Sequence, residues 1–512
     1  MAIVEKLVYF VSELDTFLVL CTVITFLLTA LIYRRISYNR KYSWPPGPKG
    51  WPLIGCSQMI ALNSGQTTAN ITKIGKQYHP DLFTLPTFAG KRIVVLNSLK
   101  AIKDAFLRQA AHTSGRPDSW PFTYVNEKHK NLGLFFETYS ASWRREKKYM
   151  VRTSRHFGYG ITKSQDIVHR EANHLVELVK KRKGQPFHLL SPLTLCMLNV
   201  TFSMVFNTTY EEDDDEFGQL LLDFMMWFVE IFKLYDLEPI LPVLDKLGIN
   251  TTLTTGKEMT VRISKFIMDH INHHKATVDF NHPRDMIDEC LIELAKNDPN
   301  SDLREFNDEK FMWMFFNLIP EQGDTAPSIF NFLMLATAVY PEIQQRVFEE
   351  IQHVIGDRDP TLDDRGKLPY TEAVILEVLR MDTPFWLLIP HHTQQDVDIL
   401  GFKIPNDTTI IPNIYAVHYD QDLWGDPENF RPERFIDKEG KLSRPEYLIP
   451  FSIGQRQCFG AQMAQKEFFI FYISLVQKFK LKLPDGDPVP KVEAQWLWVS
   501  PPEYRLQAEL RE

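Results

Sequence analysis

Cysteine is scarce in this chain: only five occur among 512 residues, and no two of them form a C-x-x-C pair. An odd number of widely spaced cysteines argues against both a disulfide scaffold and a zinc ribbon. Basic residues are also in the minority, with 57 Lys and Arg against 65 Asp and Glu, which gives a net charge of −8. Because phosphate backbones bind to net basic surfaces, we expect no nucleic-acid partner.

Internal repeats, low-complexity blocks and a G-x-G-x-x-G pattern are absent as well. The chain therefore has no dinucleotide fingerprint of its own. Apolar residues are plentiful: 44% of the chain is hydrophobic and 12% is aromatic, which supplies a large packed core and excludes global disorder. The length allows several domains, but no second Pro/Gly linker divides the body, so we predict one large domain.

One long apolar run lies near the N-terminus, where Thr16 to Tyr33 carries no charge over 18 positions. As a helix this run would span ~27 Å, close to the ~30 Å of a bilayer core. Acidic residues precede the run, and Arg34 and Arg35 follow it. This order predicts an uncleaved anchor with the later chain on the cytosolic side. A buried core helix is the alternative interpretation.

The segment after this run is rich in proline. Trp44-Pro45-Pro46-Gly47-Pro48 cannot continue a helix and predicts a stiff hinge. The chain is therefore predicted to have four parts, namely a short lumenal N-terminus over 1–15, a transmembrane anchor over 16–33, a basic and proline-rich hinge over 34–55, and a globular domain over 56–512.

The body is predicted to be mainly α with a smaller β region. Residues 80–100 show β-branched and alternating patterns typical of strands. From about 100 to 380 the apolar spacing is mainly helical, and residues 385–415 again favour strands. One helix is predicted over about 459–478, followed by strands at the C-terminus.

Two local signals stand out in the helical part. Pro341 is expected to open one helix at its first position, and Gly356 to close it. Residues 211–216 (EEDDDE) form an acidic run. We interpret this run as a solvated loop between helices, with a cation site as the alternative.

The most informative segment is FSIGQRQCFG, from Phe451 to Gly460, which precedes the last predicted helix. A cysteine just before a helix N-terminus meets unpaired amides and the positive end of the helix dipole, and both favour the thiolate. Gly454 allows a tight turn, and Gly460 allows the backbone to approach a flat ligand. With Arg456 as a partner for a carboxylate, this pattern favours Cys458 as a metal ligand over the alternative of an inert core cysteine.

FSIGQRQCFG resembles the haem-binding loop of the cytochrome P450 monooxygenases, F-x-x-G-x-R-x-C-x-G, at every defined position. The resemblance implies haem b (iron protoporphyrin IX) with Cys458 as its axial thiolate ligand. It also implies that Phe451, Gly454 and Gly460 shape the cofactor-binding loop and that Arg456 faces a haem propionate. An axial thiolate favours cleavage of the O–O bond. The domain over 56–512 would then be a haem-thiolate catalytic domain with the cytochrome P450 fold.

A second signature is Glu377-Val378-Leu379-Arg380, which is similar to the E-x-x-R of this family. At i and i+3 the two charges share one helical face. Phe430 to Phe435 (FRPERF) resembles the segment whose arginine, here Arg434, joins that pair. The resemblance implies a buried structural network of Glu377, Arg380 and Arg434; an exposed ion pair is the alternative for the E-x-x-R alone.

Further propionate contacts are implied by resemblance for Trp143 and Lys147, in a W-x-x-x-R pattern with lysine in place of arginine, and for His391. Lysine keeps the charge but loses the bidentate fork. The same basic segment offers a docking face for an acidic reductase, or alternatively only a solvated helix face; its cations are Arg144, Arg145, Lys148 and Arg152.

Residues 308–340 are predicted to form one long buried helix. Within it, Asp324 and Thr325 match the family's acid–alcohol pair, which relays protons during oxygen activation. Glu321 and Gln322 depart from the family's small residues at these positions, and Glu321 is a candidate second proton donor. Pro320 and Pro327 also lie in this helix, and Pro320 is expected to bend it.

The resemblance implies a function: oxygen insertion into a lipophilic molecule (a steroid, fatty acid, terpenoid or xenobiotic) at the endoplasmic reticulum membrane. Electrons would come from NADPH through NADPH–cytochrome reductase, with cytochrome b5 as a further partner. One alternative is a haem-thiolate isomerase or dehydratase of an oxygenated lipid, and another is a non-catalytic haem-binding or electron-carrier protein. The resemblance also implies substrate contacts in five segments, 115–135, 224–232, 311–323, 384–389 and 495–498. Their aromatic and aliphatic stripes fit an apolar small molecule, with plain core packing as the alternative for any single residue.

Overall fold

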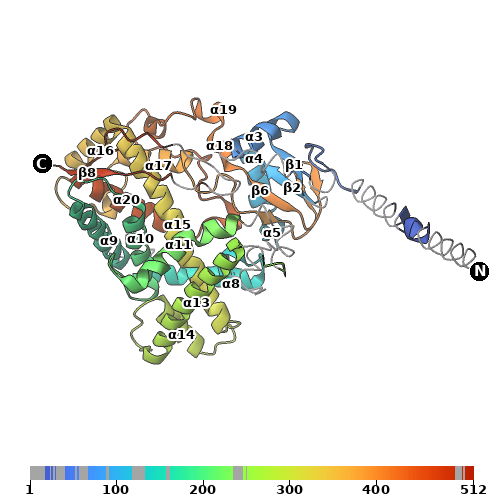
Figure 1. Ribbon diagram of the computed structural model, residues 1–512, viewed down its shortest axis with the longest axis horizontal. Coiled ribbons are helices and arrows are strands. Elements are labelled where there is room, and N and C mark those ends of the chain that lie inside the picture. Colours follow the sequence, from blue (N-terminus) through green and yellow to red (C-terminus); the bar gives the residue numbers. More distant parts are fainter. Residues whose placement is uncertain are drawn as a thin grey trace, which may run out of the picture.

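The fold is described by a computed structural model. It covers residues 18–23, 25–26, 29, 41–51, 55–56, 67–87, 91–117, 133–156, 162–233, 246–248, 251–490, 499 and 502–511. Helices make up most of these residues, and the strands form three small sheets, so the predicted mainly α class with a smaller β region is confirmed. The largest sheet and the helices around α9, α16 and α20 lie at opposite ends of the body (Figure 1).

The largest sheet joins segments that are far apart in the chain. Strands β1 (Leu82–Pro86) and β2 (Arg92–Leu96) form an antiparallel hairpin rich in β-branched residues. β2 then pairs in parallel with β6 (Thr409–Pro412), and β6 pairs antiparallel with β3 (His391–His392). The strand regions predicted at 80–100 and 385–415 therefore both contribute strands to this sheet. The other strands are β4 (Val397–Ile399), β5 (Phe402–Ile404), β7 (Phe479–Lys482) and β8 (Gln507–Leu510).

The longest helix, α15 (Asp308–Val339), crosses the molecule and is buried along most of its length. Its first turn is capped by the Asn307 side chain, which accepts from the Lys310 amide at 2.8 Å. The helix continues through Pro320 and Pro327 as one element, within one residue of the predicted limits. Its neighbours are α10 (Leu190–Val205), α11 (Asp215–Lys233), α13 (Thr251–Thr277) and α17 (Pro369–Met381).

Helix ends follow the local signals. Pro341 occupies the first turn of α16 (Pro341–Val354), and Gly356 beyond its end has a φ of +66° that favours glycine, so both expectations are confirmed. The last helix, α20 (Ala461–Lys478), starts three residues after Cys458. It packs with α16, α17 and α9 (Thr162–Lys181) around the largest buried apolar cluster.

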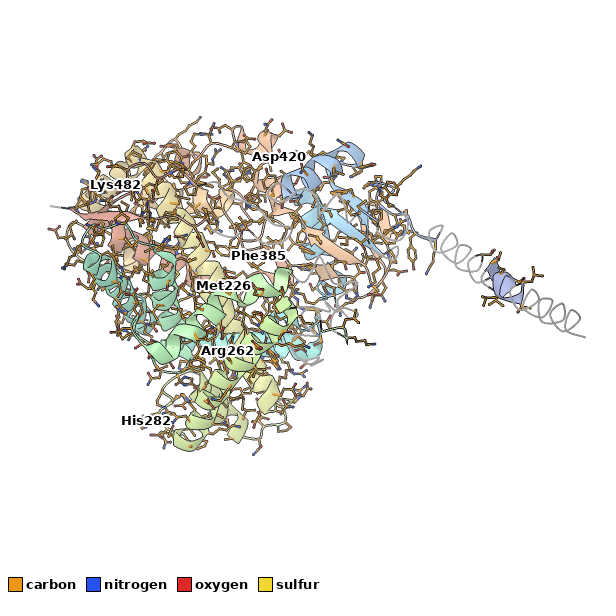
Figure 2. The ribbon with its side chains drawn as sticks, viewed as in Figure 1. Met226, Arg262, His282, Phe385, Asp420 and Lys482 are labelled. Carbon is orange, nitrogen blue, oxygen red and sulfur yellow. The ribbon has the colours of Figure 1, made fainter. Side chains whose placement is uncertain are left out.

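The other helices in the described part of the chain are mostly shorter. The remaining helices, with η marking one-turn 3-10 or π helices, are α3 (Thr67–Tyr78), α4 (Leu99–Lys103), η2 (Asp104–Arg108), α5 (Ala110–Thr113), α7 (Gly133–Phe136), α8 (Ala141–Ser154), α14 (Met286–Ala295), η5 (Leu362–Asp364), α18 (Ile414–His418), α19 (Gln421–Trp424), η6 (Pro432–Phe435) and η7 (Gly454–Arg456). Phe385, in the connection between α17 and β3, lies in the middle of the body (Figure 2).

Half of the predicted anchor, residues 16–33, lies outside the described residues. Among the helices that the structure does describe, none combines the length and the apolar character needed to cross a membrane. The anchor therefore stays a prediction.

Candidate functional site

The cysteine loop is held by its own backbone. The Cys458 amide donates to the Phe451 carbonyl at 2.9 Å, which closes the loop just ahead of α20. Gly454 has a φ of +82°, and a Cβ there would come within 2.3 Å of the Phe106 carbonyl oxygen. Glycine at 454 is therefore required by both the turn and the close contact with η2.

Neither the backbone conformation nor the packing explains why residue 460 is a glycine. Its φ of −78° suits any residue, and an added Cβ would meet no heavy atom within 4 Å. Packing among the described residues therefore does not require glycine at 460. The residue borders the central cavity, so a ligand lying against the backbone is the remaining physical reason for it.

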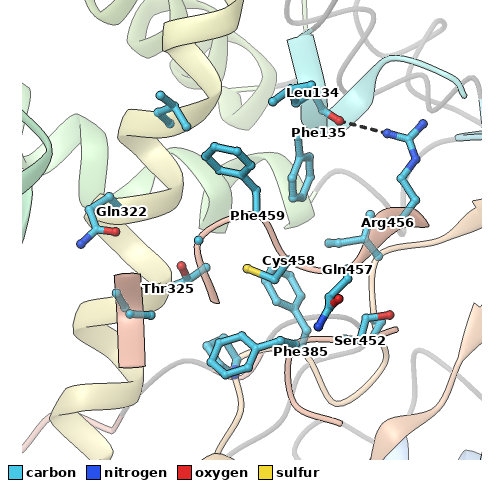
Figure 3. Close-up of a pocket in the computed structure, with 18 of the residues that line it drawn as sticks. Leu134, Phe135, Gln322, Thr325, Phe385, Ser452, Arg456, Gln457, Cys458 and Phe459 are labelled. Carbon is cyan, nitrogen blue, oxygen red and sulfur yellow. Dashed lines mark hydrogen bonds between the residues drawn. The ribbon is translucent and has the colours of Figure 1, made fainter. Parts of the chain in front are cut away.

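A mainly apolar cavity lies in front of this loop (Figure 3). The Cys458 sulfur points into it, with Thr325 of α15 on the facing side and Phe385 and Phe459 on either side. Of the five nominated substrate segments, three contribute described lining residues, which are Arg116, Leu134, Phe135, Leu318, Gln322, Pro384, Phe385, Leu388 and Ile389. No described residue of 224–232 lines the cavity, and 495–498 and most of 115–135 lie outside the described residues.

Cations gather at one edge of the cavity. Arg456 is 8% exposed and lies over the Trp143 ring at 4.1 Å. Its guanidinium donates to the carbonyls of Ser114 (2.9 Å), Leu134 (3.0 Å) and Glu137 (2.5 Å). Burial lowers the pKa of Arg456, but a guanidinium stays charged. These three bonds use three of its five N–H groups, which leaves two for an anion at the cavity edge.

Trp143 and Lys147 stand beside Arg456, and each already has a protein acceptor. The Trp143 indole N–H donates to the Leu134 carbonyl at 2.8 Å, and the Lys147 ammonium donates to the Gln455 carbonyl. Burial and the charge of Arg456 lower the pKa of Lys147. A propionate contact would add to the Lys147 bond, since an ammonium has three donors, but would replace the only N–H bond of Trp143.

His391 is buried and stacks on Phe106 at 4.0 Å. Burial and the nearby charge of Arg116 hold the pKa of His391 well below its usual range, so the ring is neutral. Its Nδ1 lies 2.9 Å from the Thr113 carbonyl, so Nδ1 carries the proton and Nε2 is an acceptor. The predicted contact with an ionised propionate therefore requires that Nε2 gain a proton.

Sequence reasoning missed Arg116, a further cation at this edge. It lines the cavity and donates to the carbonyls of Phe135 and Pro390, each at 3.0 Å. The only signal was its place in the nominated segment 115–135, which carries no motif around it.

The E-x-x-R pair is fully buried. Glu377 and Arg380, both on α17, are 0% exposed and share two bonds of 2.8 Å. Arg434 of η6 donates to Glu377 at 3.0 Å, and the Arg431 amide donates to the same carboxylate oxygen at 2.9 Å. The alternative of an exposed ion pair is wrong. Arg380 also donates to the His418 carbonyl at 2.9 Å, so this network joins α17 to the end of α18 and to η6.

The acid–alcohol pair of α15 is split by the helix. Thr325 lines the cavity, whereas Asp324 is buried and does not line it. The Ser328 hydroxyl lies 3.5 Å from one Asp324 oxygen, and the other oxygen has no partner among the described residues. Burial raises the pKa of Asp324 well above its usual range, so the neutral, protonated acid is favoured. Glu321 lies on the same helix, but its side chain is not among those described.

The family model described as "Cytochrome P450" matches residues 45–508 of this chain. The chain belongs to the cytochrome P450 family. It is 31% identical to "Cytochrome P450 2D9" of Mus musculus, over 96% of each chain, and 32% identical to "Cytochrome P450 2D20" of Mesocricetus auratus, over 96% of this chain and 98% of that one. "Cytochrome P450 2U1" of Bos taurus is 31% identical over 87% of this chain and 85% of its own length. Family membership makes this protein a haem-thiolate monooxygenase.

The residues of this P450 fit a haem. Cys458 provides a sulfur on one wall, and Gly460 leaves open space beside it. Three cations at one edge, Arg116, Lys147 and Arg456, match the two carboxylates of the porphyrin. Apolar side chains line much of the remaining wall, which suits a flat, mostly apolar macrocycle.

Gln322 has a role in the P450 that the sequence did not indicate. Instead of the family's small residue, it carries an amide that donates to Glu467 of α20 at 2.8 Å. Glu467 is 0% exposed, and its other oxygen has no partner among the described residues. This bond links the helix that carries Thr325 to the helix that follows Cys458.

Glu467 gives a pH prediction. Burial raises the pKa of Glu467 to about 8, from 4.5. Between these pH values the folded P450 keeps a proton that the unfolded chain has lost. Raising the pH through this window therefore lowers the unfolding free energy, by up to about 1 kcal/mol per pH unit for one group.

Glu467→Gln should flatten the decline in melting temperature from about pH 5 to about pH 8. The exposed Glu439→Gln is the matched control and should follow the parent. An unchanged slope for Glu467→Gln would show that other groups cause the decline.

Proposed function

We propose that this P450 inserts one oxygen atom of O₂ into a lipophilic small molecule, with electrons from NADPH through a membrane reductase. The observation that supports this most is the apolar cavity with Cys458 on one wall and Thr325 on the facing side. When bound, haem supplies the redox and oxygen-activating chemistry, with Cys458 as its ligand.

The chain's own residues would hold the cofactor and move protons. Arg456, together with Lys147 and Arg116, neutralises carboxylates at the cavity edge. The Thr325 hydroxyl is both donor and acceptor, so it can pass a proton into the cavity and receive another. Asp324, a buried neutral acid one residue away, is the proposed source of that second proton. Glu321 remains our candidate for a further donor.

The substrate class follows from the walls. Phe135, Phe385, Leu388 and Ile389 offer contact area but no hydrogen-bonding groups, and Gln322 and Thr325 are among the few polar side chains on the α15 side. Such a cavity favours apolar ligands with few polar groups. We therefore propose a steroid, fatty acid, terpenoid or xenobiotic as the substrate.

The partners are proposed from the basic helix and the N-terminal run. On α8, Arg144 is exposed, whereas Arg145 pairs with Glu305 at 2.5 Å and Lys148 with Asp302 at 3.3 Å. The docking face is therefore weaker than four unpaired cations would be. We propose that it receives an acidic NADPH–cytochrome reductase and cytochrome b5, and that residues 16–33 anchor the P450 in the endoplasmic reticulum membrane with its body in the cytosol.

Reconstitution tests this function. The full-length P450 is combined with a membrane reductase and NADPH, and a panel of lipophilic compounds is screened for spectral shifts and then for products. We expect an oxygenated product that requires NADPH, reductase and O₂. A product formed from a hydroperoxide without NADPH would support the isomerase or dehydratase alternative instead. NADPH consumption that no compound changes, without any product, would support a non-catalytic haem protein.

Thr325→Ala should uncouple the reaction. Without the hydroxyl on the cavity wall, protons reach the reacting oxygen less selectively, so NADPH is still consumed but hydrogen peroxide replaces the product. Because a positioned proton donor contributes typically 10²–10⁴-fold, product formed per NADPH should fall at least ~10-fold. The measurement is product, peroxide and NADPH in the same reaction.

Thr337→Ala is the matched control. Thr337 lies further along α15, is buried and does not line the cavity, and its hydroxyl bonds to Leu333 and Tyr472 rather than to Asp324. Its loss should leave the coupling near that of the parent. Equal coupling in Thr325→Ala and the parent would mean that protons take another route, with Glu321 as the next candidate.

A further inference from the structure

A cluster of metal-ligand side chains lies away from the haem cavity, between α9 and α10. Glu171 and His174 are one turn apart on α9, and Cys196 faces them from α10. One ligand atom of each lies within 4.8 Å of the other two. Glu171 is 2% exposed and Cys196 is 0% exposed, whereas the His174 side chain reaches solvent at 21% exposure. A buried set with one open side gives an ion both a site and an entry path.

The histidine is oriented as metal-binding histidines are. Its Nδ1 lies 3.5 Å from a Glu171 oxygen, inside the cluster, and its Nε2 lies 3.2 Å from a Glu211 oxygen outside it. A histidine that binds a metal through one nitrogen almost always gives the other N–H to a carboxylate, carbonyl or water. Glu211 is the first residue of the acidic run 211–216, for which a cation site was the alternative interpretation.

The Cys196 side chain is buried as part of the largest apolar cluster. Its thiol makes no hydrogen bond to any residue in the described part of the chain. The Glu171 carboxylate inside the metal-ligand cluster and the Glu211 carboxylate beside it attract a divalent cation, which would stabilise a thiolate at Cys196.

We propose that Glu171, His174 and Cys196 form a zinc site, with Glu211 orienting the histidine and water in the fourth position. Sulfur, imidazole nitrogen and carboxylate oxygen are the donors of tetrahedral zinc sites, and ligand atoms on such an ion lie roughly 3.3–3.6 Å apart. The 3.5 Å between His174 and Glu171 already has this value, and the sulfur must move closer. On binding, the thiol and the Nδ1 of His174 each release a proton to solvent, so the affinity rises with pH.

The described residues contain a second cluster of metal-ligand side chains, which lacks a cysteine. His274, Asp285 and Asp288 are also close together, but the His274 ring bonds to Asp285 at 2.6 Å and to the His270 carbonyl at 2.7 Å. The Arg284 guanidinium donates two hydrogen bonds to the Asp288 carboxylate, at 2.6 and 2.8 Å. Both sets contain an ion-paired carboxylate, because the Arg170 guanidinium donates to one Glu171 oxygen at 2.9 Å and the Asn199 amide donates to the other at 3.2 Å. Of the two sets, only the first contains a thiol with no hydrogen bond to a described residue.

Zinc at this site would tie α9 to α10. Further along α10, Thr201, Met204 and Val205 line the haem cavity, so the ion would also fix one wall of that cavity. We therefore expect zinc to raise the melting temperature of the holoprotein, because a ligand that binds only the folded state stabilises it.

The test uses full-length, haem-loaded protein without a polyhistidine tag, treated with a chelator and then with one equivalent of Zn²⁺. We expect about one zinc per haem by elemental analysis, a sulfur neighbour at about 2.3 Å in the zinc X-ray absorption spectrum, and a higher melting temperature. Cys196→Ala should lose the sulfur neighbour and the thermal shift. Cys290→Ala, another fully buried cysteine, should keep both.

Glu211→Gln should weaken zinc binding about 10–100-fold, as loss of a group that orients a ligand does. Asp213→Asn, in the same acidic run, should leave the affinity near the parent value. If Cys196→Ala does not retain haem, Cys196→Ser replaces it, since serine keeps the volume without the sulfur. Substoichiometric zinc, zinc with only nitrogen and oxygen neighbours, or equal loss of affinity in Glu211→Gln and Asp213→Asn would each overturn the site.

Discussion

Cys458→Ser should eliminate the far-shifted Soret band of the reduced, carbon-monoxide-treated protein, together with all NADPH-dependent product. That band reports a thiolate on the haem iron, and a serine hydroxyl at neutral pH does not supply such a ligand. Because the sulfur points into the cavity and the loop is closed by a backbone bond at 458, the substitution removes the ligand without disturbing the turn. The measurement is the difference spectrum of full-length protein.

Two controls separate ligation from folding. Cys290→Ala removes a fully buried cysteine elsewhere and should keep the parent band. Gly460→Ala adds a methyl group where no atom of the described residues lies within 4 Å, so the protein should fold normally but bind haem less tightly. A far-shifted band that survives in Cys458→Ser would end the assignment of Cys458.

Glu377→Ala should prevent accumulation of haem-loaded protein. It leaves Arg380, which is 0% exposed, without its carboxylate partner. Removing one member of a buried ion pair costs about 3–5 kcal/mol, a large share of the roughly 5–15 kcal/mol that stabilises a folded domain. Arg434 and the Arg431 amide lose an acceptor as well. Yield of haem-loaded protein and its melting temperature are the measurements.

The matched control is Glu446→Ala, which breaks an exposed pair with Lys103. An exposed pair contributes about 0–1 kcal/mol, so this variant should accumulate like the parent. Glu377→Gln keeps one acceptor oxygen and should fall between the two. If Glu377→Ala melted within a few degrees of the parent, the network would contribute no more to stability than an exposed ion pair does.

Local patterns were sufficient for the long helices. α15 and α16 begin and end within a few residues of the predicted limits because capping side chains, Pro341 and Gly356 act on their own neighbours. The sheet was not predictable in the same way. β2 and β6 pair in parallel although more than 300 residues separate them, and no local pattern encodes which strand is the partner.

The same division holds at the site. The haem loop could be found from the sequence, since FSIGQRQCFG is contiguous and each residue acts on the same turn. Gln322 could only be noted as a departure, because its partner Glu467 follows 145 residues later and becomes a neighbour through helix packing. Arg116 and the His174–Cys196 cluster could not be predicted from the sequence for the same reason.

The amino-acid sequence by itself indicated the family, the cysteine proposed as the iron ligand, and the helices that carry Thr325 and Glu377, because these depend on residues within one turn or one motif. Only the tertiary structure decided which charges are buried, that Thr325 lines the cavity whereas Asp324 does not, and which nitrogen of His391 holds its proton. Burial and long-range contact set those properties, and both arise only when distant segments pack together.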